Sequence, residues 1–172
     1  CENSILMKTL LSNINIDTRY LILEKGRITS KKSRIISSQQ QVVRYDRESS
    51  ATINENSEET VMNYYKEIVN NYDCILLSDY GKGLFTNKLT QSLINIAKEN
   101  GKKILIDPKG SDYSKYNGAY LLTPNEKEAS EATKINIDDE ATLKEAIVWL
   151  KTACDLNISL ITLSEQGIAI YE

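Results

Sequence analysis

The spacing of apolar residues changes near residue 72, and the part before it mixes helical and strand patterns. Apolar positions on one helical face predict helices over 4–11 and 59–70. Short β-prone runs predict three strands, at 20–23, 34–37 and 41–45. Because these strands are close in sequence, we expect an antiparallel sheet, followed by a polar loop over 47–58.

After residue 72 the apolar residues form continuous runs, at 73–77, 104–106, 120–122 and 160–163. Runs without alternation are typical of parallel strands that are covered on both faces. Helical spacing over 88–99 and 142–153 separates them, and a further helix is expected to begin near Glu126. The pattern therefore predicts a layered α/β sheet, with Cys74, Cys154 and Trp149 in its core.

Composition limits the function classes. The chain has 172 residues, 41% of them hydrophobic, and a net charge of −3, which describes one globular domain and argues against a nucleic-acid partner. Histidine is absent and the three cysteines are far apart, so neither a disulfide framework nor the usual metal ligands are offered. No apolar run approaches the ~20 residues that cross a bilayer, and we expect no membrane partner and a cytoplasmic protein.

Each of the four apolar runs ends in a short polar or glycine-containing segment. These strand-end segments are Ser78-Asp79-Tyr80-Gly81-Lys82-Gly83, Asp107-Pro108-Lys109-Gly110, Thr123-Pro124-Asn125-Glu126-Lys127-Glu128 and Ser164-Glu165-Gln166-Gly167. Ligands of open α/β sheets bind outside the carboxyl ends of the strands. Proline also keeps the preceding residue extended. We therefore expect the four segments to gather at one sheet edge and form a ligand site.

The first strand-end segment offers phosphate-binding chemistry. Gly81 and Gly83 would let backbone N–H groups approach a phosphate, and the Lys82 ammonium would neutralise it. Asp79 could act as a base or a metal ligand, or it could cap the loop that follows. Lys82 and Lys109 could equally be solvated surface lysines.

Asn125 and Glu128 stand three residues apart at the start of a predicted helix, on one face of it. Carboxylate and amide oxygens in this arrangement could hold Mg²⁺ through water. The alternative is an ordinary helix cap with an acidic first turn.

Three cations lie on the predicted antiparallel strands, at Lys32, Arg34 and Arg44. Beside a crevice they could bind an anionic substrate, bidentately in the case of an arginine. They could also form a charged outer face that protects exposed strand edges.

These residues carry a family resemblance over nearly the whole chain. Residues 75–83, 105–110 and 121–126 resemble the ribokinase-like (PfkB) sugar kinases. Residues 34–41 with Arg44 and Asp46, together with 162–167, are similar more narrowly to the kinase module of the bifunctional D-β-D-heptose 7-phosphate kinase/heptose 1-phosphate adenylyltransferases. The resemblance implies a ribokinase-like layered α/β sheet with a small antiparallel β lid over 18–47.

The resemblance also implies an activity and a set of site residues. The activity is transfer of the γ-phosphoryl group of ATP, with Mg²⁺, to O1 of D-glycero-β-D-manno-heptose 7-phosphate in ADP-heptose synthesis for the lipopolysaccharide core. A homodimer through the lid is implied as well. The nucleotide and Mg²⁺ residues would be Asn125, Glu126, Lys127, Glu128, Lys109, Ser164, Gln166 and Gly167, with Glu128 reaching the metal through water. The residues for the sugar and its phosphate would be Asp79, Lys82, Arg34, Gln40 and Arg44.

Some family motifs are not found between Cys1 and Glu172. The family's substrate strands would precede Cys1, and its Gly-Ala-Gly-Asp loop, which carries the base aspartate, would follow Glu172. The resemblance thus implies that the chain is the central fragment of one kinase domain, without a catalytic residue and inactive alone. A kinase for another sugar of the fructokinase type, and a non-catalytic α/β ligand-binding or dimerisation module, are the alternatives.

Overall fold

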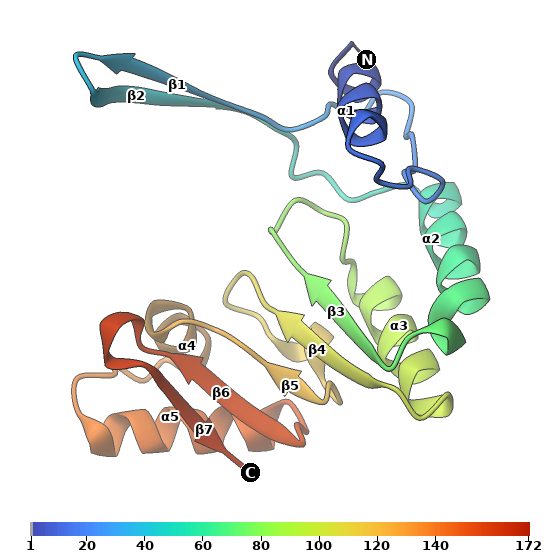
Figure 1. The fold of residues 1–172 in the computed structure, drawn as a ribbon. Helices are drawn as coiled ribbons and strands as arrows, with labels where there is room; N and C mark the ends of the chain where they lie inside the picture. Colours follow the sequence, from blue (N-terminus) through green and yellow to red (C-terminus); the bar gives the residue numbers. More distant parts are fainter. Residues whose placement is uncertain (1) are drawn as a thin grey trace.

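The computed structural model describes residues 2–172 and contains two sheets (Figure 1). A two-stranded hairpin precedes a five-stranded sheet. The elements in chain order are α1 (Glu2–Asn13), β1 (Lys31–Ser37), β2 (Gln40–Arg47), α2 (Glu55–Ile68), η1 (Val69–Asn71), β3 (Cys74–Ser78), α3 (Asn87–Glu99), β4 (Lys103–Asp107), η2 (Ser114–Tyr116), β5 (Leu121–Leu122), α4 (Glu126–Thr133), α5 (Glu140–Ala153), β6 (Ile158–Thr162), η3 (Ser164–Gln166) and β7 (Ile168–Tyr171).

The five-stranded sheet has the order β3-β4-β5-β6-β7. The pairs from β3 to β6 are parallel, and β7 runs antiparallel to β6. Helices connect the parallel strands, as α3 does between β3 and β4, because a parallel pair needs a crossover. The predicted layered α/β architecture with a small antiparallel sheet is confirmed.

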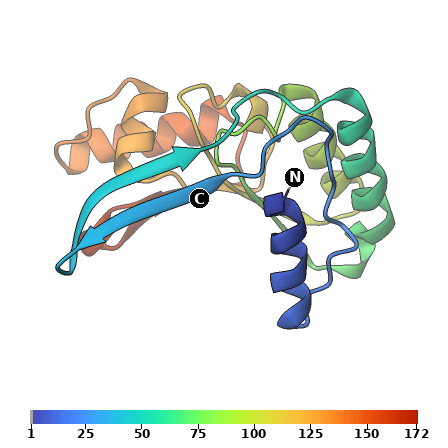
Figure 2. The same cartoon turned by 90° about the horizontal axis from the view of Figure 1, so that it is seen from above.

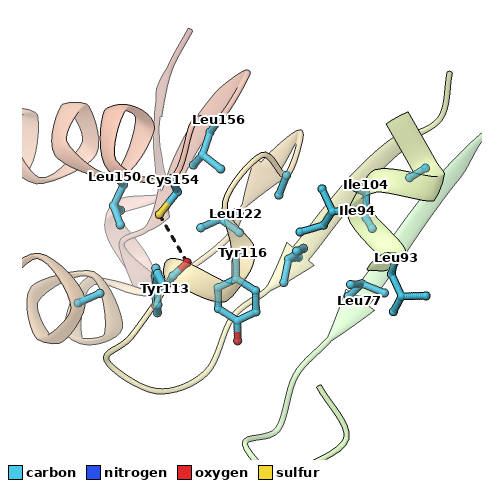
Figure 3. Packing of buried hydrophobic residues seen from close by; sticks show 14 of the residues in the cluster. Leu77, Leu93, Ile94, Ile104, Tyr113, Tyr116, Leu122, Leu150, Cys154 and Leu156 are labelled. Atoms are coloured by element: carbon cyan, nitrogen blue, oxygen red, sulfur yellow. Dashed lines mark hydrogen bonds between the residues drawn. The ribbon is translucent and has the colours of Figure 1, made fainter. Parts of the chain in front are cut away.

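Helices α3, α4 and α5 pack on one face of this sheet (Figure 2). On that face Ile104, Ile106 and Leu122 are at most 1% exposed, and Leu77 is 7% exposed. Tyr113 and Tyr116 lie between the end of α5 and the strands, with Leu150 and Cys154 close by (Figure 3). One contiguous core therefore fixes the strands and the ends of the helices.

The opposite face of the sheet is apolar and open in the described residues. Leu76 is 67% exposed, and Leu105 and Leu121, which lie beside it in register, are only half-buried. The prediction of strands covered on both faces is therefore wrong here. The strand order runs in one direction along the sheet, and right-handed crossovers then place every connecting helix on the same face.

Capping side chains set where the helices begin. Asn125 and Asp139 form capping boxes at α4 and α5, and α4 begins at Glu126 as predicted. Helix α2 begins at Glu55, a turn before the expected start, because the Asn54 side chain accepts a hydrogen bond from the N–H of Ser57. The predicted loop over 47–58 is correspondingly too long.

The hairpin of β1 and β2 projects from the body (Figure 1). The strand predicted over Tyr20 to Leu23 is wrong, because residues 21–30 have no strand structure. Side-chain contacts, and not backbone hydrogen bonds to a neighbouring strand, hold this segment in place. Tyr20 packs edge-on against Tyr64 of α2 with ring centroids 5.2 Å apart, and Glu24 accepts a hydrogen bond from the N–H of Asn54.

Two of the three predicted core residues are exposed. Cys74 is exposed because it opens β3, the edge strand. Trp149 is 41% exposed because Ala146, Ile147 and Leu150 occupy the inner face of α5. Cys154 is buried as predicted, and burial raises the pKa of its thiol to about 11. In the part of the chain that the structure describes, no helix has the length and apolar character needed to span a bilayer.

Candidate active site

The strand-end segments lie along the carboxyl edge of the five-stranded sheet, as expected. The N–H of Asp79 donates to the carbonyl of Asp107 at 3.0 Å, which joins the first segment to the second. The N–H of Thr162 donates to the carbonyl of Pro124, also at 3.0 Å. Asn125 and Thr162 form a parallel bridge, so the ends of β5 and β6 are adjacent. The sheet thus presents polar groups from several strands at one edge.

Lys109 and Glu128 meet at this edge. The Lys109 Nζ lies 2.6 Å from Glu128 Oε1. The hydrogen bond and the charge of Glu128 raise the pKa of Lys109. Glu128 Oε2 accepts from the N–H of Asn125 at 3.1 Å, and Asn125 Oδ1 accepts from the N–H of Glu128 at 2.9 Å. The helix cap is therefore formed, and both carboxylate oxygens of Glu128 are engaged.

A second carboxylate stands beside this pair. The pKa of Asp107 is raised, first by partial burial and then by the neighbouring Glu128 carboxylate. Within residues 2–172, however, no group of three acidic or cysteine side chains could hold a metal ion. Since the oxygens of Glu128 already have partners, a cation held here through water fits the donor set better than one bound directly.

The other predicted nucleotide residues are exposed and make local contacts. Lys127 pairs with Glu131 along the outer side of α4 at 3.9 Å. Ser164, Gln166 and Gly167 form the turn between β6 and β7, in which the N–H of Leu163 donates to the carbonyl of Gly167. They follow β6 and so lie at the same sheet edge, as Glu126 does at the start of α4.

Asp79 is the most heavily hydrogen-bonded side chain of the first strand-end segment. It is 5% exposed, and its carboxylate accepts from Lys115 Nζ, from Tyr116 Oη and from the N–H of Gly81, each at 2.7 Å. Of the interpretations open for Asp79, the loop cap is present in the structure. Lys115 and Tyr116 come from η2 and were not candidates from the sequence.

Lys82 lies where the hairpin joins the body. Its Nζ pairs with Glu48, just after β2, and its carbonyl accepts from the Arg27 guanidinium. Arg27 also donates to the carbonyl of Ala51 at 2.7 Å. A cavity of about 390 Å³ opens at this junction. Its lining residues are Ser30, Lys32, Glu48, Ser78, Asp79, Tyr80, Lys82, Leu84 and Phe85.

The remaining predicted sugar residues lie on the hairpin, away from that cavity. Arg34 stands opposite Arg44 in register, and Arg44 Nε lies 3.1 Å from Asp46 Oδ1. Gln40 begins β2 beside the hairpin turn. Among the hairpin residues, Lys32 lines the cavity and these three do not. The structure therefore brings Asp79 and Lys82 together and leaves Arg34, Gln40 and Arg44 apart from them.

Sequence reasoning missed Arg27, Glu48, Lys115 and Tyr116. Glu48, Lys115 and Tyr116 contact residues that are at least 34 positions away in the sequence. Arg27 contacts residues that are 24 and 55 positions away. One sequence signal was available, the glycine at 83. A Cβ there would lie 2.0 Å from the carbonyl oxygen of Ala51, and φ is +77°, so only glycine fits this close approach.

The class of protein follows from comparison with known families. Residues 3–172 match the pfkB family of carbohydrate kinases, and the chain belongs to this family. The resemblance identified from the sequence is confirmed.

Within this family, the chain is most informatively compared with two relatives of the same name. The chain is 58% identical over 166 residues to the bifunctional protein HldE of Aliarcobacter butzleri, covering 96% of this chain and 35% of the relative. It is 50% identical to the bifunctional protein HldE of Sulfurimonas denitrificans, covering 99% of the chain and 36% of that protein. The chain thus spans about a third of the length of these relatives.

Solved structures agree on the fold. The crystal structure of Sa239 matches with a TM-score of 0.74 at 20% identity, covering 98% of this chain and 54% of that one. The phosphofructokinase-2 from Escherichia coli in complex with potassium matches with a TM-score of 0.69 at 17% identity, covering 95% and 53%. At these identities the likeness concerns the fold alone.

Proposed function

We propose that the complete polypeptide containing these residues is an ATP-dependent kinase of D-glycero-β-D-manno-heptose 7-phosphate. It would transfer the γ-phosphoryl group of ATP to O1 of the sugar, in ADP-heptose synthesis for the lipopolysaccharide core. The observation that carries the proposal is the carboxyl edge of the sheet. A cavity lined by two lysines and two carboxylates opens there, and Asp79 in its wall is hydrogen-bonded to Asp107, in the same strand-end segment as Lys109 of the Lys109–Glu128 pair. The two HldE relatives supply the substrate class.

The sugar phosphate would bind in the cavity at the base of the hairpin. Its volume of about 390 Å³ is within the usual range of small-molecule pockets, about 300–1,000 Å³. Lys32 and Lys82 line it and supply positive charge. Lys82 pairs with Glu48 in the structure, so a bound phosphate would compete with that carboxylate for the ammonium. Arg34 and Arg44 could reach the substrate only if the hairpin moved toward the cavity.

The nucleotide side would be the start of α4 and the second strand-end segment. ATP supplies the phosphoryl group, and Mg²⁺ supplies charge neutralisation. Glu128 and Asn125 would hold the metal through water, and Lys109 would exchange its partner Glu128 for a phosphate oxygen. Ser164, Gln166 and Gly167 would border the nucleotide. These residues bind and orient, and positioning is the main catalytic contribution in phosphoryl transfer.

We also propose that this kinase works in the cytoplasm as a homodimer formed through the hairpin. Ile35 pairs with Val43 and Ser33 with Tyr45 on one face of the hairpin. Ile35, Val43 and Tyr45 are 46–64% exposed. Exposed apolar strands readily pair with a second copy.

A substrate panel tests the proposed function. The complete polypeptide is incubated with Mg²⁺ and ATP plus heptose 7-phosphate, fructose, fructose 6-phosphate or ribose, and products are identified by ³¹P NMR. We expect an anomeric phosphate on the heptose only, and dependence on Mg²⁺. Comparable turnover of fructose or ribose would contradict the narrow assignment, and absence of turnover with every sugar would contradict the kinase.

Two glutamates on α4 give a matched pair of variants. Glu128→Gln should lower turnover at least tenfold and raise the Mg²⁺ concentration needed for half-maximal rate, because the carboxylate charge near the metal is lost. Glu131→Gln, on the same helix and in an ion pair with the exposed Lys127, should change both much less. Equal behaviour of the two variants would contradict the assignment of Glu128.

A further inference from the structure

The Tyr116 hydroxyl joins the two sides of the candidate site. It donates to Asp79 Oδ2 at 2.7 Å and accepts from the backbone N–H of Lys109 at 3.0 Å. Asp79 in turn caps the loop of Gly81 through its other carboxylate oxygen. Lys109 is the residue whose side chain meets Glu128. A single hydroxyl thus lies between the loop beside the sugar cavity and the residues proposed for the nucleotide.

The environment of Tyr116 keeps this link in one state. The residue is 0% exposed, and its ring packs edge-on against Tyr113 with centroids 5.5 Å apart. Burial raises the pKa of the Tyr116 phenol, so the hydroxyl remains a donor to Asp79 at neutral pH. Lys115 Nζ lies 4.9 Å from the Tyr116 ring centroid and also binds Asp79. Ring, hydroxyl and carboxylate therefore have little freedom to rearrange.

The loop and the second strand-end segment are also in close contact. A Cβ on Gly81 would lie 3.2 Å from Lys109 Cγ, and φ of Gly81 is +63°. The loop backbone therefore packs directly on the Lys109 side chain. A shift of the loop relative to Lys109 would be transmitted to Lys82 at the cavity and to Glu128 at the start of α4.

We propose that Tyr116 is a positioning residue that fixes the distance between the sugar-side loop of residues 79–83 and the Lys109–Glu128 pair through its hydroxyl. The proposal rests on the proposed function, since it assigns the two sides of the link to sugar and nucleotide. Tyr116 is 0% exposed, so it would not touch either reacting group. Its effect is on the alignment of the sugar hydroxyl with the γ-phosphorus, on which transfer depends steeply.

Misalignment has a chemical signature. In the coupled reaction the O1–H of heptose 7-phosphate attacks the γ-phosphorus, the bond from phosphorus to the β,γ-bridging oxygen breaks, and ADP, heptose 1,7-bisphosphate and a proton are formed. If water attacks in place of O1–H, the products are ADP, inorganic phosphate and a proton. A looser link would increase the second reaction relative to the first. The ratio of inorganic phosphate to heptose 1,7-bisphosphate therefore reports alignment.

Two tyrosines in and beside η2 provide the test and its control. Tyr116→Phe removes the linking hydroxyl. Tyr113→Phe removes a hydroxyl that is equally buried but has no hydrogen-bond partner among the described residues. Both variants of the complete polypeptide are assayed with Mg²⁺, ATP and heptose 7-phosphate for kcat, for both KM values, for the ratio of phosphate products and for Tm.

For Tyr116→Phe we expect a fall in kcat of about ten- to a hundredfold, the range that small misplacement produces, with both KM values within about threefold of wild type. The inorganic phosphate fraction should rise. Tyr113→Phe should retain the wild-type kcat and product ratio. If Tyr116→Phe does not fold, Asp79→Asn, which weakens the same link, should show the same raised phosphate fraction.

The outcomes separate this inference from the proposed function. A wild-type protein that phosphorylates no sugar overturns the proposed function. An active wild type with an unchanged product ratio and kcat in Tyr116→Phe, or with equal losses in both tyrosine variants, overturns the positioning role. That role is also overturned if Asp79→Asn, used in place of an unfolded Tyr116→Phe, leaves the product ratio unchanged.

Discussion

The five-stranded sheet and the β1–β2 hairpin differ in how far their apolar side chains are buried. In the five-stranded sheet, strand residues such as Ile106 and Leu122 are 0% exposed beneath a layer of helices. In the β1–β2 hairpin, Ile35 and Tyr45 are 58% and 64% exposed although they have strong strand propensity. Burial therefore explains the apolar residues on the helix-covered face of the sheet, but it explains neither those of the hairpin nor Leu76 on the open face of the sheet. The apolar residues of the hairpin are expected to contact something outside the described chain.

The two faces of the hairpin differ in charge. Residues directly opposite in register share a face, so Lys32, Arg34 and Arg44 lie together with Asp46. The other face carries Ile35 and its partner Val43. A cationic face suits an anionic ligand, and an apolar face suits a second strand pair. This division supports both roles that we propose for the hairpin.

The largest expected effect is on stability. Leu122→Ala removes a fully buried side chain and should lower the free energy of unfolding by about 2–5 kcal/mol. Val43→Ala in the exposed hairpin should change it by less than about 0.5 kcal/mol in the monomer. Urea unfolding of the complete polypeptide measures both. Similar losses would show that the hairpin packs on the body.

The junction between hairpin and body should come next. Gly83→Ala places a Cβ against the Ala51 carbonyl in addition to a positive φ, and it should cost more than about 1 kcal/mol. Gly101→Ala has a similar φ of +65° but open space around the new Cβ, so it measures the backbone cost alone. The difference in urea midpoint isolates the close approach. Equal midpoints would mean that the junction has no tight contact.

The apolar hairpin face should control assembly. Val43→Lys introduces charge on that face and should weaken the proposed homodimer at least tenfold, while the Tm of the monomer stays the same. Arg34→Lys, on the opposite face, keeps its charge and is the control. Sedimentation equilibrium gives both dissociation constants. A wild-type monomer, or a Val43→Lys dimer of unchanged affinity, would contradict the assembly.

The smallest expected effect is a pH dependence of stability that arises from Glu24, in the segment before β1. Hydrogen bonds from the Ser57 hydroxyl and the Asn54 N–H lower the pKa of Glu24. A carboxyl whose pKa is lowered by folding adds stability above its unfolded pKa of about 4.3, and this is lost as pH falls through the folded value. Glu24→Gln should therefore lower Tm slightly at pH 7 and much less at pH 3. An equal difference at both pH values would contradict the linkage.

Much of the fold was predictable because its signals are local. Continuous apolar runs placed β3, β4, β5 and β6, and the possible cap at Asn125 marked the start of α4. The exposure of Leu76 was not predictable, because the face covered by helices depends on strand order. Tyr20 to Leu23 has strand composition but is anchored by side chains, and propensity does not distinguish the two cases.

The candidate site was predictable only where chain direction determines position. The ends of parallel strands must share an edge, so Asp79, Lys109 and Glu128 could be placed together. Tyr116 and Lys115 could not, since they reach Asp79 from a loop after the next strand. The distance of Arg34 from the cavity depends on the direction in which the hairpin projects, which no local pattern encodes.

Nucleotide binding at the carboxyl edge of the sheet is the property on which the proposed kinase function depends. Hydrogen exchange of the complete polypeptide, with and without Mg²⁺ and a non-hydrolysable ATP analogue, tests it most directly. We predict slower exchange in peptides covering 107–110, 123–128 and 164–167, and no change in the hairpin turn at 37–40. Protection confined to other segments, with these three unchanged, would contradict nucleotide binding at this edge.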